Sequence, residues 1–216
     1  MNLIESLFES GHTIAWDYIS SFQFLPDALL GIGDFIRGIL KTGYDEIGEG
    51  VWASPSAVIA DSACILPPCI IGANTEIRHS AFIRGNAVIG NNVVIGNSVE
   101  VKNAIISDCS EVPHFNYVGD SILGFKAHMG AGAITSNARS DKKNVILHLP
   151  DEDIDTKRMK VGAFLGDRSE IGSNSVLNPG TVIGHDAIVY PLSAVRGYVP
   201  PSSIYKGFGN IIERVY

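Results

Sequence analysis

The stretch "ILPPCIIGANTEIRHSAFIRGNAVIGNNVVIGNSVEV", from Ile65 to Val101, places an aliphatic residue at every sixth position. The repeat already begins at Ile59, and the same register returns from Leu165 to Val195. The aliphatic positions are Ile59, Ile65, Ile71, Ile77, Ile83, Ile89, Ile95, Val101, Leu165, Ile171, Leu177, Ile183, Val189 and Val195. Neither the helical period nor strand alternation gives a strict spacing of six. A hexapeptide period is typical of a parallel β-helix.

The geometry of a β-helix explains the residue types in this repeat. Each unit supplies one short strand and one corner, three units close a coil, and coils stack about 4.8 Å apart. The aliphatic residue fills the axis, and the residue two positions earlier is small or β-branched, as in Ala63, Thr75 and Val93, because it points into a tight corner. We therefore predict an all-β fold, a parallel β-helix over residues 48–216, whose handedness the period does not fix.

The first part of the chain has a different pattern. Residues 1–47 look helical, with a short helix predicted from Leu3 to Phe8. A longer helix is predicted between Pro26 and Gly43, because apolar residues fall near one of its faces. These apolar residues are Leu29, Ile32, Ile36, Ile39 and Leu40.

Composition excludes several classes of protein. The formal net charge of -7 argues against general nucleic-acid binding and against an anionic membrane surface. No stretch reads as a membrane span, and no Lys or Arg precedes Arg37, so we expect no secretory signal. Cys64, Cys69 and Cys109 lack metal-ligand spacing, and no metal is expected. We expect the cysteines to be reduced and mostly packed, in a cytoplasmic protein.

The repeat is interrupted around "HFNYVGDSILGFKAHMGAGAITSN", from His114 to Asn137. Its register slips by one residue near Ile106 and again near Leu123, and it stops between Asn137 and Val161, which leaves an inserted loop at 138–160. A regular coil points its polar side chains outward and apart, so we expect function where the pattern breaks.

The repeat together with "HFNYVGD" and "GAGAITSN" resembles the left-handed β-helix acyltransferases, and within them the acetyltransferase domain of bifunctional glucosamine-1-phosphate acetyltransferase/uridylyltransferases. The resemblance covers about 55–205 and leaves the N-terminal helices outside it. The long 138–160 segment is more similar to archaeal bifunctional sugar-phosphate enzymes. The resemblance implies left-handed coils, a homotrimer with sites between subunits, and transfer of acetyl from acetyl-CoA to an amino-sugar 1-phosphate. Such a reaction belongs to nucleotide-sugar or cell-envelope precursor synthesis.

The resemblance also assigns catalytic residues. His114 matches the base that takes the proton of the attacking ammonium, a task suited to a histidine near neutral pH. The amide of Ala131 matches the group that stabilises the oxyanion. The alternative for His114 is a structural histidine in a turn. We expect the two register slips to turn His114 and Tyr117 toward the same bound amine.

Substrate-binding residues follow from the same match. Arg84 and Lys102 lie one coil apart, so they should stack and repel unless an anion such as a sugar phosphate separates them. The alternative is a solvated pair neutralised by Glu100. The other residues assigned to the acceptor are Tyr117, His128, Asn137 and Lys143, with His128 standing where the family usually has Asn. Contacts with acetyl-CoA are assigned to Ala131, Asn137, Ser173 and Lys206.

Two alternatives compete with this function. A hexapeptide carbonic anhydrase would need three histidines around zinc, and His79, His114 and His128 are the only plausible set, although no two have the usual close spacing. The second alternative is a non-catalytic trimeric scaffold or regulatory partner of a separate sugar-phosphate nucleotidylyltransferase. It arises because residues 1–47 are too short for a uridylyltransferase domain.

Overall fold

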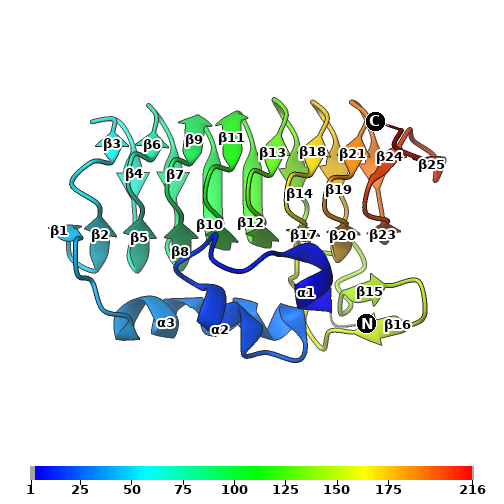
Figure 1. The fold of residues 1–216 in the computed structure, drawn as a ribbon, viewed down its shortest axis with the longest axis horizontal. Helices are drawn as coiled ribbons and strands as arrows, with labels where there is room; N and C mark the ends of the chain where they lie inside the picture. Colours follow the sequence, from blue (N-terminus) through cyan, green and yellow to red (C-terminus); the bar gives the residue numbers. More distant parts are fainter. Residues whose placement is uncertain (1–2, 216) are drawn as a thin grey trace.

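The computed structural model describes residues 3–215 and confirms the all-β prediction. The chain forms a left-handed parallel β-helix with three faces, here called the first, second and third face (Figure 1). The first and third faces form one sheet because β10 (Glu100–Ile106) and β12 (Tyr117–Leu123) run across the corner between them.

Most strands belong to one face each. The first face contains β2 (Val51–Ala53), β5 (Cys69–Ile71), β8 (Ala87–Ile89), the ends of β10 and β12, β17 (Ala163–Leu165), β20 (Thr181–Ile183) and β23 (Tyr198–Val199). The second face contains β3 (Val58–Ile59), β6 (Glu76–Ile77), β9 (Val94–Asn97), β11 (Glu111–His114), β13 (His128–Met129), β18 (Glu170–Ile171), β21 (Ile188–Val189) and β24 (Ser203–Tyr205). The third face contains β4 (Cys64–Ile65), β7 (Phe82–Ile83), the starts of β10 and β12, β14 (Ile134–Thr135), β19 (Val176–Leu177) and β22 (Ala194–Val195). At the two ends, β1 (Asp45–Gly48) and β25 (Ile211–Glu213) pair antiparallel with β2 and β24.

The predicted aliphatic positions form the axial core. Ile71 pairs with Ile89 in the next coil, and both are at most 1% exposed. Ile59 and Ile65 in the first coil are only partly buried, since no coil covers them. Polar corner residues are satisfied internally, as when Thr75 Oγ1 donates to Gly90 O at 2.6 Å.

Both predicted register slips lie at the corner between the third and first faces. Each shortened corner turns through one residue with positive φ, Asn103 at 50° and Asp120 at 49°. On the third face, the axial position that follows Val118 in the next coil is the buried Thr135, whose Oγ1 accepts the Gly119 N–H at 2.9 Å. The slips therefore narrow this corner in two successive coils.

The N-terminal helices cover the first face (Figure 1). They are α1 (Leu3–Leu7), α2 (Trp16–Ser20), the 3₁₀ helix η1 (Leu25–Leu29) and α3 (Ile32–Gly38). The predicted short helix at Leu3 is confirmed. The single helix predicted from Pro26 to Gly43 is wrong, because the chain breaks at Gly31 and leaves the helix in an extended conformation at Ile39. Leu40 is consequently 83% exposed rather than on an apolar face.

The segment at 138–160 is more ordered than the predicted loop. It contains an antiparallel hairpin of β15 (Ile146–His148) and β16 (Asp153–Asp155). The hairpin extends the covering layer of the first face, because Val145 and Leu147 are fully buried in the same apolar cluster as the N-terminal helices.

The three cysteines are free, as expected, but only Cys69 is buried, and burial raises the pKa of its thiol to about 12. Cys64 is exposed, so the expectation of a packed residue is wrong there. Within residues 3–215, no helix has the length and hydropathy needed to cross a bilayer.

Candidate active site

The narrowed corner gathers polar side chains around Asp120, whose side chain is 8% exposed. Lys102 Nζ lies 3.1 and 3.3 Å from the two carboxylate oxygens, and Asn103 Nδ2 donates to Oδ1 at 2.9 Å. Asn137 Nδ2 contacts Asp120 Oδ2 at 2.5 Å and Tyr117 Oη at 3.1 Å. The structure therefore brings three of the predicted substrate-binding residues, Lys102, Tyr117 and Asn137, into one group, here called the Asp120 cluster.

Arg84 lies one coil from Lys102 in the same cluster. Its Nη1 is 2.7 Å from Glu100 Oε1, and this hydrogen bond raises the pKa of the already basic Arg84 guanidinium. Each cation has its own carboxylate, Glu100 for Arg84 as the alternative anticipated and Asp120 for Lys102, so the pair does not require an added anion to lie stacked. The cluster presents both signs of charge to a ligand.

Tyr117 leans from the third face toward the narrowed corner. Its ring lies over Gly119, where a Cβ atom would come within 2.3 Å of the phenol oxygen. Burial raises the pKa of Tyr117, and the carboxylates of Asp120 and Glu100 raise it further. The phenol thus stays protonated near neutral pH. Since its oxygen accepts from Asn137, its own O–H is available to donate to a ligand.

His114 lies at the opposite corner, between the second and third faces, at the end of β11. Its backbone N–H donates to Asn116 Oδ1 at 2.9 Å, and its carbonyl accepts the Gly132 N–H at 3.0 Å. Asn116 is 3% exposed and donates to the carbonyls of Gly130 and Ala133 at 2.8 and 2.9 Å. This asparagine therefore locks the corner of His114 onto the glycine-rich corner of the next coil.

Ala131 sits in that glycine-rich corner. Its carbonyl accepts the Asn174 N–H at 2.8 Å, whereas its own N–H has no hydrogen-bond partner among residues 3–215. An amide without a partner in the chain is what an oxyanion contact requires. The Ser173 N–H one coil further is equally unpartnered within the described chain. The geometry alone therefore does not single out Ala131.

Of the predicted acetyl-CoA contacts, Ala131, Ser173 and Lys206 follow the same corner along the β-helix, whereas Asn137 lies in the Asp120 cluster. Ser173 lies under Gly130, where a Cβ atom would meet the Ser173 backbone nitrogen at 2.7 Å. Further along, Lys206 Nζ lies 5.9 Å from the centre of the Tyr190 ring. His114, Ala131, Ser173 and Lys206 thus lie on one edge of the third face, and the Asp120 cluster lies along the other edge. Within one chain, His114 and Tyr117 face different corners, which differs from the expectation that both turn to one point.

Two predicted substrate residues lie apart from the Asp120 cluster. His128 is on the second face, with Nδ1 2.8 Å from Glu170 Oε2. That hydrogen bond raises the pKa of His128. Lys143 is exposed on the inserted segment, where its backbone N–H donates to Asp141 Oδ1 at 3.2 Å. No group of three His, Cys, Asp or Glu side chains within residues 3–215 could hold a metal ion, and this includes His79, His114 and His128.

The structure adds residues that were absent from the predicted site. Asp120 was noted only as part of the motif, although its spacing of one coil from Lys102 could have revealed the pair. Asn103 follows Lys102 directly and reaches Asp120 because the corner is shortened. Asn116 carries no such signal, because its partners depend on which way a buried side chain points.

Comparison with known proteins gives one matching family model and several relatives that are similar to part or most of the chain. The family model of the GMPPB C-terminal domain matches residues 65–146. The bifunctional protein GlmU of Methanococcus vannielii is 34% identical over 220 residues, which cover 92% of this chain and 47% of that protein. A bifunctional sugar-1-phosphate nucleotidylyltransferase/acetyltransferase of Sulfurisphaera tokodaii is 35% identical over 103 residues, covering 48% of this chain and 26% of that protein.

The solved structures to which the chain is similar include PerB from Caulobacter crescentus in complex with CoA and GDP-perosamine. It has a TM-score of 0.38 and 20% identity, over 70% of this chain and 51% of that one. A hexapeptide transferase family protein from Anaplasma phagocytophilum has a TM-score of 0.38 and 13% identity, over 76% of this chain and 78% of that one.

The extent of these matches has two consequences. The relative from Methanococcus vannielii covers 92% of the chain, so the similarity must reach into residues 1–47. The expectation that the N-terminal helices lie outside the resemblance is therefore wrong. The chain also spans about half, or less, of the length of these curated relatives.

Proposed function

We propose that the chain transfers an acetyl group from acetyl-CoA to an amino-sugar 1-phosphate similar to glucosamine 1-phosphate, a proposal supported by its similarity to a GlmU protein and to a bifunctional sugar-1-phosphate nucleotidylyltransferase/acetyltransferase. The observation that carries the proposal is the Asp120 cluster. Side chains from successive coils converge there in a repeat that otherwise points its polar groups apart. The reaction would serve the synthesis of nucleotide sugars or cell-envelope precursors in the cytoplasm, the compartment that the free cysteines favour.

The chemistry needs a base, an oxyanion donor and a leaving thiolate. His114 accepts a proton from the substrate ammonium, and the free amine attacks the thioester carbonyl of acetyl-CoA. The carbonyl oxygen becomes an oxyanion that accepts a hydrogen bond from the Ala131 N–H. When the carbon–sulfur bond breaks, the amide product forms and the CoA thiolate takes up a proton. The bridge through Asn116 holds the base and this amide on adjacent coils.

The Asp120 cluster fits an acceptor that carries both signs of charge. An amino-sugar phosphate has an ammonium and a phosphate, and the cluster offers Arg84 and Lys102 beside the carboxylates of Glu100 and Asp120. The phenol of Tyr117 and the amide of Asn137 are suited to sugar hydroxyls. We assign supporting contacts to His128 and Lys143 from neighbouring subunits, since neither lies in the cluster of its own chain.

We propose a homotrimer because the groups of one chain lie on two edges of the third face. The outward side chains between these edges are partly exposed and mainly apolar, as with Phe82, Ile134 and Val176. Packing of this face against another subunit would create the cleft in which the base and the acceptor meet. Light scattering that returned a monomer at micromolar concentration would overturn this part of the proposal.

The decisive assay is acetyl-CoA-dependent release of free thiol with a panel of amino-sugar 1-phosphates and amino-sugar nucleotides. We expect turnover with at least one amino-sugar 1-phosphate, and none with its N-acetylated form, which has no free amine. Failure of the whole panel, with acetyl-CoA binding also absent in calorimetry, would refute the catalytic proposal.

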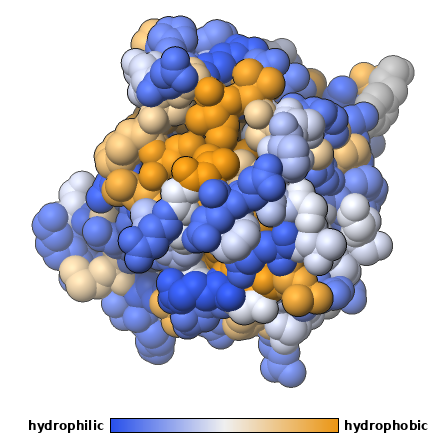
Figure 2. Space-filling view, turned by 90° about the vertical axis from the view of Figure 1, so that its left-hand side faces the viewer, coloured by the Kyte–Doolittle hydropathy of each residue, from blue (hydrophilic) through white to orange (hydrophobic). Residues whose placement is uncertain are grey.

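The second candidate is a trimeric scaffold or regulatory partner of a separate nucleotidylyltransferase. One observation favours it: the first coil has an apolar end (Figure 2), where Ile47, Val58 and Leu66 are exposed and the axial Ile59 and Ile65 are only partly buried. A partner protein could cover this end. Acetyl-CoA binding with measurable turnover would favour the enzyme, and binding of a nucleotidylyltransferase without acetyl-CoA binding would favour the scaffold.

A further inference from the structure

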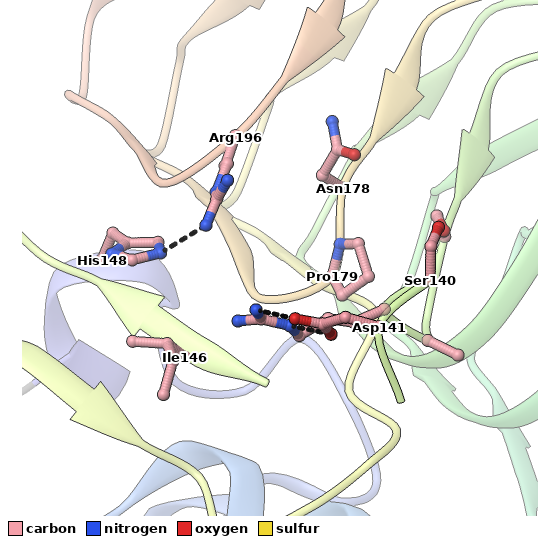
Figure 3. A pocket seen from close by; sticks show the side chains of 10 residues that line it. Ser140, Asp141, Ile146, His148, Asn178, Pro179 and Arg196 are labelled. Carbon is pink, nitrogen blue, oxygen red and sulfur yellow. Dashed lines mark hydrogen bonds and ion pairs between the residues drawn. The ribbon is translucent and has the colours of Figure 1, made fainter. Parts of the chain in front are cut away.

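A second polar pocket lies on the same corner as the Asp120 cluster, further toward the C-terminal end of the β-helix. It has a volume of about 300 Å³ and lies between this corner and the inserted segment. Backbone hydrogen bonds run from Ser136 to Leu177 and from Asn178 to Val195, so Asn178 and Arg196 follow Ser136 in successive coils. At about 4.8 Å a coil, Arg196 is about 10 Å along the corner from Ser136. Figure 3 shows Arg196 and His148 on one side of the pocket and Asn178 and Ser140 on the other.

Arg196 supplies an uncompensated positive charge to this pocket. Its Nη2 is 3.2 Å from His148 Nε2, and Asp153 Oδ1 is 2.8 Å from His148 Nδ1. An arginine only donates, so His148 accepts at Nε2 and keeps its proton on Nδ1, facing Asp153. His148 is thus a neutral bridge that orients the guanidinium. Among residues 3–215, no carboxylate pairs directly with Arg196.

Arg139 supplies a second, preorganised guanidinium to the same pocket. Its Nε and Nη2 grip Asp141 at 2.9 and 2.6 Å, which fixes the plane of the group. Its Nη1 has no hydrogen-bond partner among the described residues 3–215 and is free to donate. Two arginines and one aspartate line the pocket, so these side chains leave a net positive charge while His148 is neutral.

We propose that this pocket binds a phosphate group between Arg139 and Arg196, with Asn178 and the Ser140 hydroxyl as further hydrogen-bonding groups. Paired guanidinium groups suit phosphate because their planar N–H donors match its oxygens. The phosphate has three possible sources: free inorganic phosphate, the diphosphate of a nucleotide-linked sugar that extends along the corner from the Asp120 cluster, or acetyl-CoA. The binding site itself does not depend on the proposed acetyl transfer.

Calorimetry in phosphate-free buffer tests the site with inorganic phosphate, uridine diphosphate and acetyl-CoA as separate probes. We expect phosphate binding to the wild type to weaken at least about tenfold in Arg196→Gln and in Arg139→Gln, because each loses a charge-assisted contact. The control is Arg78→Gln, whose arginine pairs with Glu76 on the second face, and it should bind as the wild type does. Circular dichroism should show that all variants are folded.

Competition between probes identifies the source. A nucleoside diphosphate that displaces phosphate and depends on Arg196 indicates a nucleotide-linked ligand. If acetyl-CoA displaces phosphate and depends on Arg196, the bound phosphate belongs to the coenzyme. If neither probe displaces phosphate, the ligand is free phosphate. Equal phosphate affinity in wild type, Arg196→Gln and Arg139→Gln would overturn the site, as would the absence of binding by all three probes. Acetyl transfer to an amino-sugar 1-phosphate by the wild-type protein would separate this failure from a failure of the proposed function.

Discussion

The Oδ1 atom of Asn116 accepts a hydrogen bond from the backbone N–H of His114 at 2.9 Å, and Asn116 is 3% exposed. The same side chain donates to two carbonyls of the next coil, so it joins the proposed base to the corner that carries Ala131. Backbone ladders link the coils along each face. Here a buried amide reinforces the ladder where the proposed base and the proposed oxyanion donor must keep a fixed separation.

Asn116→Ala should lower both stability and catalysis. Two buried carbonyls lose their donor, at a cost of about 1–3 kcal/mol in the free energy of unfolding. Misplacement of His114 should lower kcat about tenfold or more, with little change in the KM for acetyl-CoA. Asn91→Ala is the control, because Asn91 also bridges coils, through Ala73 N–H and Asp108, but away from the site. It should lose stability and keep kcat. An equal loss of kcat in both variants would make Asn116 merely structural.

His114→Ala should lower kcat by about 10²–10⁴-fold if base catalysis dominates. The side chain is exposed and lies outside the axial core, so the melting temperature and the proposed trimer should be nearly unchanged. Steady-state kinetics, with a melting curve for each variant, make the measurement. Full activity in the variant, or loss only through unfolding, would leave His114 with a structural role.

Gly119→Ala should displace the Tyr117 ring without breaking the coil. The new Cβ would lie 2.3 Å from the phenol oxygen and 2.5 Å from Cζ, so the ring must move away from Asn137. Loss of one acceptor hydrogen bond corresponds to a rise of about tenfold in the acceptor KM. Gly38→Ala is the matched control, since a Cβ there meets nothing within 4 Å. If both variants had the wild-type acceptor KM, Tyr117 would not contact the acceptor.

The axial core and the site's location were predictable because the fold is nearly one-dimensional. A residue such as Ile89 contacts its counterpart eighteen positions away, so a period in the sequence becomes a stack in space. The slips could be read for the same reason, and they locate the narrowed corner. The charge balance was harder to predict. The sequence argument weighed Glu100 as a partner for the two cations but not Asp120, although Asp120 is one coil from Lys102.

The layer that covers the first face, made of the N-terminal helices and the β15–β16 hairpin, was less predictable because its sequence has no repeat. The helix expected from Pro26 to Gly43 was inferred from apolar spacing, which a 3₁₀ turn followed by a short helix also satisfies. The hairpin of β15 and β16 is fixed by burial of Val145 and Leu147 against the first face. That contact joins segments far apart in the sequence, so it has no local signal.

Arg84→Ala should weaken use of the acceptor far more than binding of acetyl-CoA. The guanidinium is held by Glu100 at 2.7 Å in the Asp120 cluster, away from the edge that carries Ala131 and Ser173. Loss of a charge-assisted contact with phosphate should raise the acceptor KM by about 10–100-fold. Arg78→Ala removes a similarly exposed arginine that pairs with Glu76 of the second face. It should change neither the acceptor KM nor the affinity for acetyl-CoA. An unchanged acceptor KM in Arg84→Ala would remove Arg84 from the site.

The His128–Glu170 pair should give a pH-dependent part of the stability. The hydrogen bond to Glu170 raises the pKa of His128 above its ordinary value of 6.5, so the folded state holds this proton more tightly than the unfolded chain. The contribution is fully present below about pH 6.5 and is lost as the pH rises through the raised folded value. It should be at most about 1 kcal/mol, since water screens a half-exposed pair. Glu170→Gln should therefore melt below the wild type at pH 5.5 and with it at pH 9. Glu76→Gln is the control, because Glu76 is similarly exposed and pairs with Arg78, which does not titrate in this range. The difference in melting temperature between Glu76→Gln and the wild type should stay constant from pH 5.5 to 9. If the difference for Glu170→Gln were equally constant, His128 would not carry the linked proton.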